Sequence, residues 1–320
     1  MSLLIPALLF TALPGALGLD VPANVRQFYN DVKAKGKCDN KLSSGFYNDE
    51  FGGPDMSYCG DHMADSGIIY LAGPSTGTKS SGMFSNMDVD CDGTQAPING
   101  DTRCGDTPQT QSRTSARLTV AGYNAGISDL NPHIHPYVVF GNSGENGKGF
   151  PTFEPSEYGM EMASVMAVVC GDKMFYGVWG DENADNGPRP SVGEVSLSLA
   201  TACYGQKMSG RDEDGSSHND YDVLYIGFTG KDAVPGAKGA NWAAGSFDEF
   251  HSSIKSLGDK LVSKIGSGGS GSTPTTTSAA APSATATCKW TGHCLGATCS
   301  TADDCSDDLT CMNSKCAVRN

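Results

Sequence analysis

The stretch Ser164-Val-Met-Ala-Val-Val-Cys-Gly-Asp-Lys-Met-Phe-Tyr-Gly-Val-Trp179 decides the fold. Two apolar and aromatic runs flank the turn-forming residues 170–173, and this pattern is typical of a β-hairpin. Two further apolar stretches predict strands over residues 136–140 and 222–228. The centre of the chain is therefore expected to be a β-sheet or a β-barrel.

A helix is predicted after these strands. Apolar residues recur at spacings of three and four from Phe247 to Ile265, so they form one stripe of an amphipathic helix. Acidic residues fall in its first turn and lysines in its last turn, as the helix dipole favours. Gly258 weakens the pattern without breaking it. The sum is an α+β fold in which helices pack on the sheet or barrel core.

The ends of the chain differ from this core. Residues 1–18 carry no charged side chain and end in small residues, which predicts a secretory signal peptide and an extracellular protein. A buried helix or a membrane anchor is the alternative, but the apolar run is short and Pro6 and Pro14 interrupt it. No later stretch reaches transmembrane length, so we expect no membrane partner.

Composition divides the remainder into a domain, a linker and a small module. Residues 19–265 form the large domain, whose six cysteines suit three disulfides. Residues 266–287 contain only Gly, Ser, Thr, Pro and Ala, so they cannot build a core and are expected to be a linker. Residues 288–320 hold six more cysteines, which predicts a disulfide-rich module. Zinc binding is disfavoured, because no C-x-x-C pair occurs there.

The charge balance restricts the partners. The 320 residues contain 22 Lys and Arg against 36 Asp and Glu, a net charge of −14. Nucleic acids bind through basic side chains, so a nucleic-acid partner is excluded. A cationic or neutral partner fits this balance better.

Two carboxylates flank the loop that follows the predicted hairpin. Asp181 comes directly after the aromatic run, and Glu194 stands thirteen residues later, before a new apolar stretch. Glycoside hydrolysis needs two such groups, one to protonate the leaving oxygen and one to activate water or attack. Trp179, beside Asp181, is expected to stack on a sugar face.

Calcium binding is the competing interpretation of the same acids. Asp181-x-Asn183-x-Asp185-x-Gly187 and Asp88-x-Asp90-x-Asp92-Gly93 both resemble calcium loops. An EF-hand also needs a glutamate at the twelfth position, and that position is Val192 in one loop and Asn99 in the other. Calcium loops or solvated turns therefore remain open from the pattern alone.

The large domain resembles the fungal chitosanases of glycoside hydrolase family 75. The similarity covers nearly all of residues 22–265 and includes all six cysteines of the domain. The segments that carry it are 86–93, 127–130, 133–142, 164–170, Tyr176-Gly-Val-Trp-Gly-Asp181, 193–200, 222–229, 231–236 and 253–262.

The resemblance implies an inverting endo-chitosanase that cleaves β-1,4-glucosamine linkages, with Asp181 and Glu194 as the catalytic pair. It requires no metal and no organic cofactor. Asp88, Asp90 and Asp185 are candidates for binding the amines of chitosan, a polycation. The apolar residues after Glu194 favour it as the general acid, which leaves Asp181 as the base.

Two other functions stay open at this level. One is a glycosidase that acts on another polysaccharide, and the other is a non-catalytic protein that binds calcium and carbohydrate. The module at 288–320 is similar to small modules tethered to fungal chitin-active enzymes, which implies chitin binding with Trp290 as a platform; alternatively, this ring covers the disulfides. His133 and His135 are expected to be structural, and the protein is expected to be a monomer.

Overall fold

The computed structural model describes residues 18–35, 38–48, 56–74, 83–94, 100–105, 112–143, 150–184, 190–211, 216–266, 309–312 and 315–318. The chain separates into two compact units, Met1–Ser270 and Gly271–Asn320. In the second unit, β11 (Leu309–Met312) pairs antiparallel with β12 (Lys315–Val318), and Cys311 is disulfide-bonded. Apart from Gly18, the predicted signal peptide lies outside the described residues, as does nearly all of the linker.

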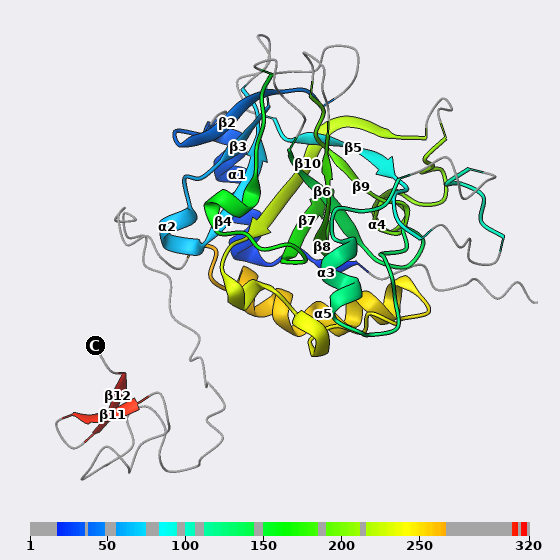
Figure 1. Ribbon diagram of the computed structural model, residues 1–320. Helices are drawn as coiled ribbons and strands as arrows, with labels where there is room; N and C mark the ends of the chain where they lie inside the picture. Colours follow the sequence, from blue (N-terminus) through cyan, green and yellow to red (C-terminus); the bar gives the residue numbers. More distant parts are fainter. Residues whose placement is uncertain are drawn as a thin grey trace, which may run out of the picture. The chain divides into compact units, whose positions relative to one another are not determined.

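Six strands of the large unit close into a barrel. Their order around the ring is β7, β8, β6, β9, β5 and β10, and β7 closes it by pairing with both β8 and β10. These strands are β5 (Ser85–Asp90), β6 (Tyr137–Asn142), β7 (Val165–Cys170), β8 (Lys173–Asn183), β9 (Glu194–Ser196) and β10 (His218–Phe228). The predicted mixed fold with a sheet or barrel core is confirmed, and the core is a barrel (Figure 1).

Shorter elements extend the barrel on two sides. β4 (Ile68–Ala72), β3 (Met56–Cys59) and β2 (Lys41–Phe46) continue the sheet from β10, and β1 (Leu19–Asp20) pairs with β8. The helices are α1 (Ala23–Lys35), α2 (Met63–Ser66), α3 (Arg117–Gly122), α4 (Leu197–Tyr204) and α5 (Phe247–Val262). Short 3-10 turns are η1 (Pro155–Tyr158), η2 (Lys231–Ala233) and η3 (Gly236–Lys238).

The central hairpin forms as its sequence predicts. β7 and β8 pair from Val165↔Val178 to Cys170↔Lys173, so residues 171 and 172 make the turn. Gly171 takes a φ of 63°, a value that favours glycine. The expected strands at 136–140 and 222–228 appear within β6 and β10.

Alternation along the strands separates two buried clusters. Val138, Phe140 and Trp179 belong to one cluster, which fills the barrel. The Phe140 ring reaches from β6 across to Gly227 on β10, where an added Cβ would lie 3.3 Å from it. Val139 belongs to the other cluster, which α1 and α5 cover. Residues level with Val139 therefore face away from the barrel interior.

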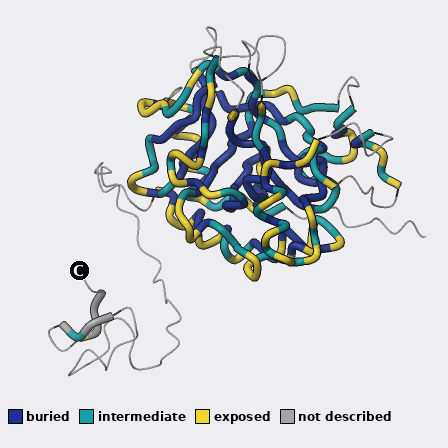
Figure 2. Tube along the Cα trace, viewed as in Figure 1, coloured by how far each residue is buried: buried dark blue, intermediate teal, exposed yellow. Residues whose placement is uncertain are grey.

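Helix α5 packs against β7 and β8 (Figure 1). Ser246 caps it by accepting a hydrogen bond from the Glu249 backbone, and Phe250, Ile254 and Leu261 are buried on its inner face. Figure 2 shows the strands buried along most of their length and the outer side of α5 exposed. No helix among the described residues is long and apolar enough to cross a membrane.

Three disulfides fix the large unit, as its six cysteines predict. Their pairs are Cys38–Cys59, Cys91–Cys104 and Cys170–Cys203. The second ties the segment after β5 to the loop at residues 100–105, and the third ties the end of β7 to α4. The second therefore braces the end of β5, the strand that carries Asp88 and Asp90.

Candidate active site

Strand register brings the acidic residues into one row. β5 pairs parallel with β9, which places Asp88 beside Glu194. The antiparallel pairing of β6 with β9 puts Val139 level with Glu194, and the pairing of β6 with β8 puts Asp181 beside Val139. Asp88, Glu194, Val139 and Asp181 thus occupy neighbouring positions on β5, β9, β6 and β8. All four side chains project to the face outside the barrel.

The row sets the spacing of the two candidate catalytic residues. Asp181 and Glu194 lie on strands separated only by β6. Two strand spacings amount to about 10 Å between their Cα atoms. Val139, 5% exposed, stands between them. The sequence pair is therefore brought together by the barrel, through two strands that are not neighbours in the chain.

Asp181 is held firmly by one of its oxygens. Its Oδ1 accepts hydrogen bonds from the Ser115 backbone nitrogen at 3.0 Å, from Ser115 Oγ at 2.7 Å and from the Glu182 backbone nitrogen at 2.8 Å. Its Oδ2 is buried and has no hydrogen-bond partner. Burial raises the pKa of Asp181 to about 6, although the hydrogen bonds from Ser115 act in the opposite direction. This carboxyl therefore holds a proton in mildly acidic solution.

This environment differs from the one that the sequence predicts. Asp181 does not open a polar loop, because β8 continues to Asn183 through its pairing with β6. Asp181 is 4% exposed. The apolar setting that favours a general acid thus belongs to Asp181. Glu194 is only partly buried, at the first residue of β9, and its Oε1 accepts a hydrogen bond from Ser191 Oγ at 3.3 Å.

Asp90 and Asp92 form a carboxylate cluster with Asp181. One oxygen of each residue lies within 4.8 Å of the others, and this is the one group of the described residues that could hold a metal ion. The Asp92 backbone nitrogen donates to Asp90 Oδ1 at 2.8 Å. Burial and then the negative charge of Asp181 raise the pKa of Asp90 well above its usual value. The cluster therefore needs protons or a cation to offset its charge.

The two segments that resemble calcium loops are largely strands where the structure describes them. Asp88 and Asp90 lie within strand β5, and Asp181 and Asn183 lie within strand β8. Extended strands direct alternate side chains to one face and do not wrap around an ion as a loop does. Asp88 is partly buried and accepts a hydrogen bond from Asn86 Nδ2 at 2.7 Å. Asp185 and Trp290 lie outside the described residues.

Trp179 requires a correction. Its side chain is 1% exposed and belongs to the cluster that fills the barrel. Its indole nitrogen donates to the Asp181 backbone oxygen at 3.1 Å. The ring is enclosed on the face opposite to the acidic row, so it cannot stack on a sugar. Its hydrogen bond instead holds the backbone of Asp181 from the interior of the barrel.

The two histidines have different surroundings. His135 is buried, where Nδ1 accepts from the Asn131 backbone and Nε2 lies 2.9 Å from the Trp242 backbone oxygen, so it is structural as expected. His133 lines a cavity of 530 Å³ beside α4, with Nδ1 3.7 Å from Asp101 Oδ2. Burial lowers the pKa of His133.

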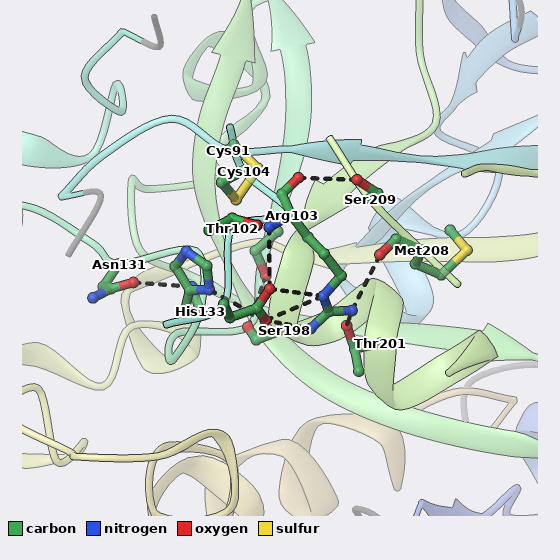
Figure 3. A network of polar contacts seen from close by, with 12 residues as sticks. Cys91, Thr102, Arg103, Cys104, Asn131, His133, Ser198, Thr201, Met208 and Ser209 are labelled. Carbon is green, nitrogen blue, oxygen red and sulfur yellow. Dashed lines mark hydrogen bonds and ion pairs between the residues drawn. A yellow bond between two sulfur atoms is a disulfide. The ribbon is translucent and has the colours of Figure 1, made fainter. Parts of the chain in front are cut away.

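Arg103 organises that neighbourhood (Figure 3). Its guanidinium pairs with Asp101 at 2.6 Å and donates to Thr201 Oγ1 and the Met208 backbone oxygen. The loop at residues 100–105 is thereby fixed to α4, which begins directly after β9. This network anchors the helix that directly follows β9, the strand on which Glu194 lies.

Sequence reasoning missed two residues of the candidate site. Asp92 stands in the quoted acidic segment, but the sequence alone gave it no role beyond a calcium ligand. Ser115 is the main hydrogen-bond donor to Asp181, and it lies 66 positions away from it. No local pattern marks a serine at that distance, so a site search starting from Asp181 could not find it.

Comparison with known proteins assigns the family. Residues 87–264 match the fungal chitosanases of glycosyl hydrolase group 75. An endo-chitosanase B from Aspergillus oryzae is 44% identical over 252 residues, which cover 78% of this chain and 94% of the relative. An endo-chitosanase from Aspergillus fumigatus is 44% identical over 253 residues, with the same coverage. An endo-chitosanase C from Aspergillus oryzae is 37% identical over 73% of this chain and 55% of its own length. The chain therefore belongs to the fungal chitosanases of glycosyl hydrolase group 75, and it is a glycoside hydrolase.

Proposed function

We propose that this protein is an endo-chitosanase that hydrolyses β-1,4 linkages between glucosamine units, with Asp181 and Glu194 as its catalytic carboxyls. Relatives named endo-chitosanases, 44% identical over 78% of the chain, support the activity. The observation that carries the site is the row in which Asp181 and Glu194 flank Val139 on one face of the barrel.

The charge of the site fits a cationic polymer. Asp90, Asp92 and Asp181 make no ion pair within the described part of the chain, and the whole protein carries a net charge of −14. Protonated glucosamine units supply the missing positive charge when they bind. Asp88 and Asp90 lie in or beside the row and are our candidates for contacting the amines, with Asp92 behind them.

We assign Asp181 as the general acid and Glu194 as the general base. Asp181 carries a proton at Oδ2, because Oδ1 already accepts three hydrogen bonds. Substrate binding has to open a path to Oδ2, because Asp181 is 4% exposed. The proton passes to the glycosidic oxygen as the bond to C1 breaks. Glu194 removes a proton from a water molecule, whose oxygen attacks C1 from the opposite face.

The resemblance implies inversion, and the strand register leaves room between the two carboxyls for the water that inversion needs. Inverting glycosidases hold their carboxyls about 6.5–9.5 Å apart so that a water fits between, whereas retaining enzymes hold them about 5–5.5 Å apart. The Cα atoms of Asp181 and Glu194 are about 10 Å apart by strand register, with one strand between. Each turnover consumes one water, and proton exchange with solvent restores both carboxyls.

Three features beyond the site complete the proposal. The uncharged residues 1–18 and the three disulfides support secretion. The six cysteines and Trp290 of residues 288–320 support a tethered module that binds chitin. The acidic row is complete within one chain, which supports a monomer.

Hydrolysis of defined polymers tests the activity. We expect reducing ends to appear from deacetylated chitosan but not from fully acetylated chitin, together with a rapid fall in viscosity from internal cleavage. Proton NMR in the first turnovers should show the α-anomer. Absence of cleavage of deacetylated polymer would reject the proposed function, and a β-anomer would reject inversion alone.

A further inference from the structure

A short segment, residues 112–116, is held between two parts of the barrel. At one end, the Gly93 backbone nitrogen donates to the Ser112 backbone oxygen at 3.1 Å. At the other end, the Ala116 backbone nitrogen donates to the backbone oxygen of Gly180, a residue of β8, at 2.9 Å. The segment therefore links the residues that follow β5 to β8, next to the proposed general acid.

This segment supplies hydrogen-bond donors to two members of the carboxylate cluster. The Ser112 backbone nitrogen donates to Asp92 Oδ1 at 2.9 Å. Ser115 donates to Asp181 Oδ1 twice, from its backbone nitrogen at 3.0 Å and from Oγ at 2.7 Å. Every residue except proline carries a backbone N–H, so of these donors only the Ser115 hydroxyl depends on the side chain.

Packing does not explain a serine at position 115. The residue is exposed, so its side chain fills no space in the buried core. Asp181, to which its hydroxyl donates, is 4% exposed. The hydroxyl thus stands at the surface and acts on a buried carboxyl through a hydrogen bond.

The donors to Asp181 distinguish its two oxygens. The terminal torsion of an aspartate is soft, so an unrestrained carboxyl exchanges its oxygens by rotation. Here Oδ1 accepts three hydrogen bonds, of which the one from the Ser115 hydroxyl is the shortest, whereas the buried Oδ2 has no partner. This arrangement holds the carboxyl in one orientation and leaves Oδ2 for the proton.

Titratable and charged groups surround this carboxyl from the elements packed against it. They are Asp90, Asp92, Tyr137 and Glu182, with Arg113 and Arg117 next to Ser115 in the sequence. Burial has the largest effect on the pKa of Asp181 and raises it, the hydrogen bonds from Ser115 lower it, and the charge of Asp92 raises it. The Ser115 hydroxyl therefore offsets part of the cost of ionising a buried acid.

We propose that Ser115 is a positioning residue for the general acid: its hydroxyl fixes Oδ1 of Asp181, so that Oδ2 presents its proton to the glycosidic oxygen. The inference rests on the proposed function, because it takes Asp181 as the acid. Ser115 acts through Asp181 and exchanges no proton with the substrate.

Steady-state kinetics of Ser115→Ala test the proposal. Below the pKa of about 6, we expect kcat for deacetylated chitosan to fall about tenfold, as for loss of one hydrogen bond to a charged group, with KM within about twofold. A deacetylated chitobiosyl fluoride, whose leaving fluoride needs little protonation, should lose less than about twofold. The alkaline limb of kcat/KM on chitosan should move up by about one pH unit, because the Asp181 carboxylate loses a donor.

Two further variants separate positioning from a structural effect. Ser115→Thr keeps the hydroxyl at an exposed position that has room for a methyl group, so it should restore kcat and the pH limb to within about twofold and a few tenths of a unit of the wild type. Ser256→Ala, which removes an exposed hydroxyl from α5, is the matched control and should change neither.

The inference is rejected if Ser115→Ala keeps wild-type kcat and pH dependence, or if its kcat falls equally for chitosan and the fluoride. It is also rejected if Ser115→Thr is as impaired as Ser115→Ala. A wild type that cleaves no deacetylated chitosan would reject the proposed function and this inference with it, whereas the other results in an active wild type reject the inference alone.

Discussion

The Asp181 carboxyl is asymmetric, and this asymmetry defines its chemistry. Three donors saturate Oδ1, while Oδ2 is buried without a donor. One oxygen of this carboxyl also lies within 4.8 Å of an oxygen of Asp90 and of Asp92. Water would solvate both oxygens equally, so the folded protein favours the protonated form. A carboxyl that holds its proton at mildly acidic pH suits a general acid, and chitosan is a cation under the same conditions.

Stability against pH tests this description of Asp181. Its pKa rises from 3.8 to about 6 on folding, so the folded state binds more protons and loses stability as pH rises from 3.8 to 6. Asp181→Asn removes this loss. We expect the variant to match the wild type below pH 3.8 and to exceed it at pH 8 by up to about 3 kcal/mol. Urea unfolding at both pH values checks this, with Asp172→Asn as the control. A variant less stable than wild type at pH 8 would contradict the buried, protonated carboxyl.

Single residues of the candidate site could be predicted where several acidic residues stand close together in the sequence. Asp88, Asp90, Asp181 and Glu194 stand at strand ends or within strands, and the structure gathers them in or near one row. The sequence could not show on which face of the sheet the Trp179 side chain lies, because a bulge decides this. Strand β6 pairs with Trp179 and then with Asp181, so Gly180 is left without a paired residue. That extra residue places Trp179 and Asp181 on opposite faces.

At the scale of elements, local patterns were reliable where one face meets the core. The β7–β8 hairpin and helix α5 formed where alternation and three-to-four spacing predict them. The extension of β8 through Asp181 to Asn183 was missed, because its polar sequence resembles a loop. Pairing with β6 supplies the hydrogen bonds that keep it extended, and no sequence pattern reveals that partner.

Gly258 shows how closely α5 packs on the barrel. A Cβ at this position would lie 2.6 Å from atoms of the Tyr176 ring, so a larger residue must displace the helix or the ring. We expect Gly258→Ala to destabilise the protein by about 1–2 kcal/mol, because overpacking outweighs the gain in helix propensity. The change in Tm measures this, with Ser256→Ala, exposed on the same helix, as a neutral control. An unchanged or higher Tm for Gly258→Ala would show that this contact is not tight.

At the scale of the whole molecule, the chain separates into two compact units, for which we propose different roles. The large unit carries the acidic row, and residues 266–287 contain nothing that could dock on it. The module at 288–320 is therefore expected to act only by holding the enzyme near a surface. Composition alone predicts the linker and the separate module, and both this division and the module's binding stay predictions.

Truncation after Gly266 tests the tethered module. Activity on soluble chitosan should stay within about twofold, because the truncation leaves the acidic row in the large unit unchanged. Activity on insoluble chitin-rich material should fall several-fold, because a tethered binder raises the local enzyme concentration. Trp290→Ala should reproduce much of this loss. If truncation leaves both binding to insoluble polymer and its degradation unchanged, the module is not a carbohydrate anchor.

The catalytic pair is tested most directly by kcat/KM on deacetylated chitosan for Asp181→Asn and Glu194→Gln. Each amide keeps the shape of the side chain but can neither donate nor accept the catalytic proton, so we predict a fall of about 10³-fold or more in both variants. Asp172→Asn should keep wild-type activity, and unchanged far-ultraviolet circular dichroism should show that all three proteins are folded. Activity within about tenfold of the wild type in either catalytic variant would contradict the account.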